Sequence, residues 1–225
     1  MDRPEWVAVD PSNGWANRWV YCTLTNNAQR GRGDKPAVDA ANPRANNVMG
    51  HIIRWKEDGD FDGAGFVWNH FVLAGDAASE RAEHQGNVTG DAFACPDSLA
   101  FGPQGLAWIC SDMSPSDMQR DGLAESPKGP MARLGNNSLL ACDVHSGEAR
   151  RFMVGPVHCE LAGSAFTPDG RTLFVSVQHP GEAGGDRSDP KQPRRTSNWP
   201  DHSASGRPRS AVVAVRRKDG GVVGS

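Results

Sequence analysis

Short apolar stretches alternate with polar, turn-rich segments along the chain, and one order of features occurs three times. Each copy starts with an acidic residue, continues as an apolar strand, turns at proline and glycine, and returns as a second strand. The three copies start at Glu5, Asp97 and Glu160. Because strand-sized apolar runs bounded by Gly, Pro and Asn are typical of antiparallel sheets, the pattern predicts an all-β fold.

Further strands follow each copy and complete a repeating unit. They are expected at 46–55 and 66–73 after the first copy, at 136–142 and 148–154 after the second, and at 210–217 after the third. Four strands per unit, repeated around an axis, form the blades of a β-propeller. We therefore expect one domain over residues 1–225, a partial β-propeller with about three four-stranded blades. The blade-like units span roughly 3–76, 95–155 and 158–225.

The number of units bears on whether the propeller can close. Propellers close with about 4–8 blades, so three units leave two sheet edges open. Since the first residues already belong to a strand, we expect the other blades to lie N-terminal to this sequence or on a partner chain. A curved open sheet that is complete in itself is the alternative.

Composition and charge exclude several partners. The formal net charge is -3, from 24 basic and 27 acidic residues without a long basic block, so nucleic acid is not expected as a partner. No stretch approaches the roughly 20 apolar residues of a membrane-spanning helix. Charged residues follow Met1 at once, so no signal peptide pattern is present. The five cysteines lack CxxC spacing, which favours buried free thiols.

The repeated acidic residues are the first candidates for chemistry. In a propeller the first strand of each blade lies beside the central channel, so Glu5, Asp97 and Glu160 would converge at one mouth of it. Close carboxylates repel one another unless a cation binds, and calcium, magnesium and ferric iron suit such oxygen ligands. We interpret all three as metal ligands. The alternative is that each accepts hydrogen bonds from loop amides at the start of a strand.

Other polar residues could complete such a site. Asn27, or its neighbour Asn26, could add an amide oxygen to a calcium shell, although a role in a turn is the alternative. Arg44 is a candidate phosphate ligand because a guanidinium can bind two oxygens of a phosphate group at once. His179 ends a strand and is a second candidate for substrate binding. A solvated surface charge for Arg44 and a structural hydrogen bond for His179 are the alternatives.

Ordered phrases of the sequence carry a resemblance to a known family. They are Arg3-Pro4-Glu5-Trp6, Cys22-Thr23-Leu24-Thr25-Asn26-Asn27, Ala41-Asn42-Pro43-Arg44, Gly50-His51-Ile52-Ile53-Arg54-Trp55 and Gln178-His179-Pro180-Gly181-Glu182. Together they resemble the C-terminal half of PhoX-type alkaline phosphatases, and the resemblance covers nearly the whole chain. No P-loop, GxSxG, HExxH or GxGxxG motif points to another enzyme class.

The resemblance implies a six-bladed propeller with a mixed Fe(III) and Ca2+ cluster, which hydrolyses small-molecule phosphate monoesters. It implies that Glu5 and Glu160 are catalytic metal ligands, with Asp97 and Asn27 as further ligands. The N-terminal half of the propeller would be needed for closure and would carry a Tat export signal, so we expect a periplasmic or secreted protein. The family's cysteine iron ligand has no match here, and its phosphate-binding arginine, expected near the last metal glutamate, cannot be placed.

Three functions therefore remain in view. The first is a metal-dependent phosphomonoesterase, for which this chain would be incomplete and truncated at its N-terminus. The second is a non-catalytic propeller module that binds a ligand or a partner chain. The third is a calcium-dependent lactonase-like hydrolase, since such enzymes also gather Glu, Asn and Asp on a propeller axis.

Overall fold

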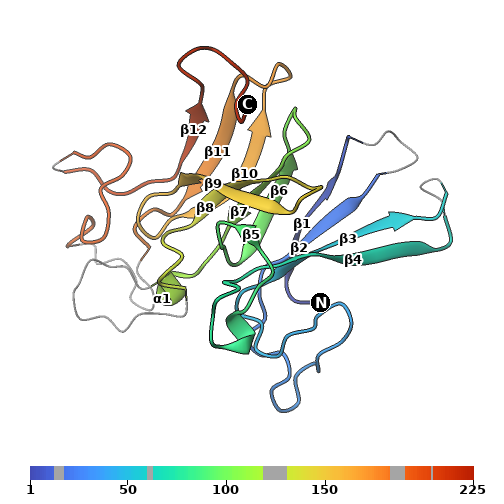
Figure 1. Ribbon diagram of the computed structural model, residues 1–225. Helices are drawn as coiled ribbons and strands as arrows, with labels where there is room; N and C mark the ends of the chain where they lie inside the picture. Colours follow the sequence, from blue (N-terminus) through green and yellow to red (C-terminus); the bar gives the residue numbers. More distant parts are fainter. Residues whose placement is uncertain (13–17, 60–62, 119–130, 183–190, 204) are drawn as a thin grey trace.

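Three sheets, antiparallel except for one short parallel strand, make up almost all the regular structure of the described residues (Figure 1). The computed structural model describes residues 1–12, 18–59, 63–118, 131–182, 191–203 and 205–225. Within these residues the helical segments are a 3-10 turn, η2 (Ala82–His84), and one short helix, α1 (Pro115–Met118). The all-β prediction is therefore confirmed.

The first sheet is a meander of four strands in chain order. Its strands are β1 (Pro4–Val9), β2 (Val20–Leu24), β3 (His51–Glu57) and β4 (Phe66–Leu73). Gly50 precedes β3 with a φ of 74°, and a Cβ there would lie 2.1 Å from the Thr25 carbonyl oxygen. A residue without a side chain is thus required where the chain enters β3.

The second sheet has five strands in the order β5-β9-β8-β7-β6. They are β5 (Thr89–Gly90), β6 (Pro96–Phe101), β7 (Ala107–Ser111), β8 (Ser138–Cys142) and β9 (Glu148–Val154). β5 pairs with β9 in parallel, and the sequence did not predict this short strand. The third sheet has three strands, β10 (Glu160–Phe166), β11 (Leu173–Gln178) and β12 (Ala211–Val215). The sheets thus have four, five and three strands, where about four each were expected.

Two apolar cores join the sheets side by side. The core between the first and second sheets includes Tyr21, Ile52, Val72, Leu99, Ile109 and Leu140. The core between the second and third sheets includes Trp108, Leu139, Leu161, Leu173 and Val175. Each fully buried large apolar side chain contributes about 1.5–3 kcal/mol relative to exposure. As a result β6, an edge strand of the second sheet, packs against both β1 and β10 (Figure 1).

All five cysteines are buried and free, as the sequence favoured. Burial raises the pKa of the Cys95, Cys110, Cys142 and Cys159 thiols to about 12. Because the thiolate is the reactive form, these side chains behave as small apolar groups.

The two outermost sheets each expose apolar side chains. On β1 these are Trp6, Val7 and Val9, and on the third sheet they are Phe174 and Val212. The described residues do not form a closed ring of sheets. Within the same residues, no helix has the length and apolarity needed to cross a bilayer.

Candidate active site

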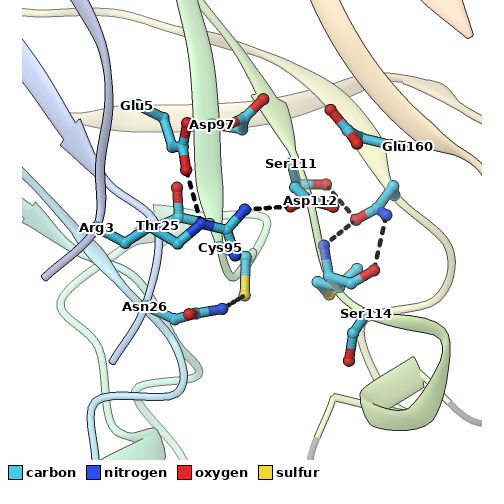
Figure 2. Close-up of polar contacts among 12 residues, drawn as sticks. Arg3, Glu5, Thr25, Asn26, Cys95, Asp97, Ser111, Asp112, Ser114 and Glu160 are labelled. Carbon is cyan, nitrogen blue, oxygen red and sulfur yellow. Dashed lines mark hydrogen bonds and ion pairs between the residues drawn. The ribbon is translucent and has the colours of Figure 1, made fainter. Parts of the chain in front are cut away.

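The structure brings the three repeated acids together. Glu5, Asp97 and Glu160 lie near the starts of the neighbouring strands β1, β6 and β10, and Figure 2 shows Glu5 beside Asp97, with Glu160 on the next strand start. Burial, then the nearby charges of Glu160, Asp112 and Glu5, raise the pKa of the Asp97 carboxyl to about 6. Such mutual repulsion is the behaviour expected of carboxylates that share one site.

The same backbone turn precedes each acid. Arg3, Cys95 and His158 lie two residues before Glu5, Asp97 and Glu160, and their φ angles are 50°, 52° and 53°. This left-handed conformation costs an ordinary residue about 1–2 kcal/mol, so packing must maintain it. The strand pairing then shifts register just beyond, between Pro4 and Val7, between Pro96 and Leu99, and between Ala162 and Ser164. Each acid is thus presented by the same combination of a left-handed turn and a register shift.

Hydrogen bonds between the sheets hold these strand starts in place. The Thr23 hydroxyl on β2 donates to the carbonyl oxygen of Asp97 at 2.5 Å. The Thr25 hydroxyl donates to the carbonyl oxygen of Pro96 at 3.0 Å. On the other side, the backbone N–H of Gly163 donates to the Ser98 hydroxyl at 2.8 Å. The position of Asp97 is thus fixed from both neighbouring sheets.

Arg3 brings a positive charge into this carboxylate cluster. Its Nε donates to Glu5 Oε1 at 2.6 Å and its Nη2 donates to Asp112 Oδ2 at 2.7 Å. Partial burial lowers the Arg3 pKa, but hydrogen bonds to both carboxylates outweigh this effect and raise it. The Arg3 side chain keeps 46% of its surface exposed, so a ligand at the cluster can reach it. Sequence reasoning missed both Arg3 and Asp112.

His179 lies on the other side of the cluster, beside Glu160. Its Nε2 is 3.1 Å from Glu160 Oε2, and its Nδ1 is 3.2 Å from Glu182 Oε2. Gln178 Nε2 donates to the second oxygen of Glu160 at 2.8 Å. Burial and the charge of Asp112 raise the Glu160 pKa, and the hydrogen bond from His179 lowers it in part.

A buried amide, Asn137, fixes the backbone beside two of the acids. Its Oδ1 accepts from the Met113 N–H at 2.7 Å and from the Ser111 hydroxyl at 3.0 Å. Its Nδ2 donates to the Met113 carbonyl oxygen and to the carbonyl oxygen that precedes Glu160, each at 2.9 Å. In the sequence, Asp112 lies between Ser111 and Met113, which both form hydrogen bonds with Asn137. The amide therefore sets Asp112 and Glu160 relative to one another.

Asn27 makes its contacts within a buried network of the first sheet. Its Nδ2 donates to Asp2 Oδ1 at 3.0 Å, and its Oδ1 accepts from the Gln29 N–H at 3.0 Å. Asp2 also pairs with Arg30 at 2.5 Å, and both side chains are almost completely buried. The asparagine that faces the cluster is Asn26, whose Nδ2 donates to Cys95 Sγ at 3.6 Å (Figure 2).

Arg44 is a buried side chain that holds backbone carbonyls. Its Nη1 donates to the carbonyl oxygens of Ala74 at 2.7 Å and Gln85 at 2.9 Å, and its Nη2 donates to that of Gly50. Burial lowers the Arg44 pKa to about 10. These bonds tie the loop after β4 to the start of β3 and occupy both terminal nitrogens, while Nε is buried without a partner among the described residues.

The donor chemistry of the cluster suits a hard cation, since carboxylate oxygens are the ligands that calcium, magnesium and ferric iron prefer. Within the described residues, however, no three His, Cys, Asp or Glu side chains are arranged to hold a metal ion. Glu5 and Glu160 instead pair with Arg3 and His179. The residue types therefore fit a metal, and further ligands or a rearrangement of these side chains are needed to complete its shell.

Comparison with known proteins identifies the class and then the family. The model of a phosphatase family, described as alkaline phosphatase PhoX, matches residues 1–181. A solved structure, Pseudomonas fluorescens PhoX in complex with vanadate, a transition state analogue, is similar to the chain with a TM-score of 0.82 and 43% identity. A search of curated proteins finds no match. This chain belongs to the PhoX family of alkaline phosphatases.

The similarity to that structure covers 100% of this chain and 35% of the other. The chain thus spans about a third of the length of the protein it resembles. The activity, substrates and partners of the whole protein are therefore matters for proposal.

Proposed function

We propose that the chain forms one part of a metal-dependent phosphomonoesterase whose site lies at the starts of β1, β6 and β10. The observation that carries this proposal is the convergence of Glu5, Asp97 and Glu160 around Arg3, in a member of the PhoX family. Glu5 and Glu160 are the principal metal ligands in this proposal, and Asp97 and Asn27 are further candidates. The family resemblance favours Fe(III) and Ca2+ as the metals.

The side chains of the cluster have different roles toward a bound phosphate ester. Bound metal supplies Lewis acidity and an activated oxygen nucleophile at this site. Arg3 binds a phosphoryl oxygen, because its guanidinium is charged, partly exposed and held beside the acids by Glu5 and Asp112. His179, beside Glu160, contacts the substrate from the opposite side and orients the carboxylate. Glu5, Asp97 and Glu160 bring negative charge into the site, and a bound cation would offset this charge.

Arg44 stays a prediction as a substrate ligand, and its three backbone partners support a structural role instead. Asn27 likewise stays a prediction, since its side chain would have to leave Asp2 to coordinate a metal.

We also propose that the three sheets are blades of a six-bladed propeller. The apolar residues exposed on β1 and on the third sheet are the surfaces that neighbouring blades would cover. The similar solved protein is nearly three times as long as this chain, which leaves enough sequence for the other blades. By the same resemblance the complete protein acts on small phosphate monoesters in the periplasm or outside the cell.

The test is metal content and p-nitrophenyl phosphate hydrolysis by the complete gene product that contains this chain. We expect bound iron and calcium with activity, and loss of both in Glu5→Gln and Glu160→Gln. Asp91→Asn is the control, because Asp91 is an exposed acid that bonds the backbone of β9. Folded protein without metal or activity would favour the binding-module alternative. Hydrolysis of lactones with calcium alone would favour a lactonase.

A further inference from the structure

A fourth carboxylate, Asp112, lies at the cluster although it is not one of the repeated acids. It follows β7 directly and faces Arg3 from the second sheet, 109 residues away in the sequence (Figure 2). We propose that Asp112 is a positioning residue that orients the Arg3 guanidinium for binding a phosphate group. This inference rests on the proposed phosphatase function, because it assigns a role within the same site.

The geometry around Arg3 supports this role. Glu5 accepts from Nε and Asp112 accepts from Nη2, so two different nitrogens of the planar guanidinium are held by carboxylates on two different sheets. Two such bonds define the plane of the guanidinium, whereas one bond alone would leave the long side chain free to rotate. Within the described residues no partner is seen for Nη1, so its N–H groups can bind an anion. The bond to Asp112 thereby fixes the orientation of the Arg3 guanidinium.

Asp112 is itself held rigidly. Its backbone N–H donates to the carbonyl oxygen of Cys95 at 2.9 Å, which ties it to the turn that precedes Asp97. Ser111 and Met113, on either side of it, are both bound by the buried side chain of Asn137. The Asp112 side chain is 20% exposed, so its bond to Arg3 is partly shielded from water. A fixed carboxylate can impose an orientation on its partner, which a mobile surface acid cannot.

The chief alternative is that Asp112 binds metal itself, since its charge is close enough to raise the pKa of Asp97. The two roles predict different dependence on Arg3. A positioning residue acts through Arg3 and loses its influence when Arg3 is removed. A metal ligand acts whether or not Arg3 is present.

The experiment is a double-mutant cycle on the complete gene product with Asp112→Asn, Arg3→Ala and the pair together. Asp112→Asn keeps the size of the side chain and removes its charge. Binding of inorganic phosphate is measured by calorimetry, hydrolysis of p-nitrophenyl phosphate by its kcat and KM, and bound metal by elemental analysis. Asp112→Glu tests rescue by a conserved charge, and Asp91→Asn is a control for the loss of an exposed acid from the same sheet.

We expect Asp112→Asn to weaken phosphate binding and raise KM by about 10-fold, the usual effect of a lost charged hydrogen bond. The kcat and the metal content should stay within about twofold of wild type, by the same argument. In the Arg3→Ala background the substitution should have no further effect, and Asp112→Glu should recover part of the binding.

Two results would overturn the inference. One is loss of metal in Asp112→Asn, which would make Asp112 a ligand. The other is an equal loss of phosphate binding with and without Arg3, which would show that Asp112 acts independently. If the wild-type protein binds phosphate through Arg3 and Asp112 but hydrolyses no ester, the proposed function fails and the positioning role stands. If it binds no phosphate, the positioning role fails as well.

Discussion

The buried amide of Asn137 offers a sharp test of how the site is held. Asn137→Ala removes the partners of three backbone groups, the N–H and carbonyl of Met113 and the carbonyl that precedes Glu160. An unsatisfied buried polar group costs about 1–3 kcal/mol, and water that enters the vacated space recovers part of this. We therefore expect a loss of about 4 kcal/mol of unfolding free energy.

A change of 1 kcal/mol shifts the melting temperature by roughly 2–4 °C in a chain of this size and by about a third of that in a protein three times as long, so the expected decrease for the complete gene product is about 3–5 °C. Differential scanning calorimetry of the complete gene product, without added metal, measures it. Asn136→Ala is the matched control, because the neighbouring Asn136 has a buried Oδ1 without a partner and its removal should change melting little.

Asn137→Asp tests the roles of the amide oxygen and the amide nitrogen separately. It keeps the accepting oxygen, but its second oxygen replaces the nitrogen that donates to the two carbonyl oxygens, so most of the destabilisation should remain. The reasoning is refuted if Asn137→Ala melts within about 1 °C of wild type, because the three backbone groups would then find other partners at little cost.

Further predictions follow from other features of the structure. In metal-free protein, stability to urea should fall as the pH rises from about 4 to about 6, because the folded state raises the pKa of Asp97 to about 6 and so binds more protons than the unfolded state. Asp97→Asn should remove this part of the pH dependence. Arg30→Ala should destabilise by about 3–5 kcal/mol in urea unfolding, because it leaves the charge of Asp2 buried and unpaired. Gly50→Ala should abolish soluble folded protein on gel filtration, whereas Gly59→Ala, with open space at its Cβ, should cost about 1 kcal/mol.

Local patterns in the sequence predicted most of the strands. The second strand pair of the second unit was expected at 136–142 and 148–154, and β8 and β9 occupy 138–142 and 148–154. These strands were predictable because alternation of apolar residues and a tight turn are properties of neighbouring residues. β5 was missed because a strand of two residues has no period to detect.

In the site, the sequence likewise predicted the residues that recur in each repeat. The acids could be found because each occurs at the same place in a repeated phrase. Asp112 could not, because its partnership with Arg3 joins residues 109 apart and depends on how two sheets pack. Nor does the sequence reveal that the Arg44 guanidinium contacts three backbone carbonyls. The partners of Asp112 and Arg44 depend on the tertiary structure, and the periodicity of the sequence does not encode them.

The left-handed turn two residues before each acid has an evolutionary consequence. Each sheet orients its own acid with its own turn at residue 3, 95 or 158, and hydrogen bonds between the sheets then fix the strand starts relative to one another. Outer strands and long connections can then diverge, lengthen or acquire insertions without misdirecting the chemistry, provided that each strand start is preserved.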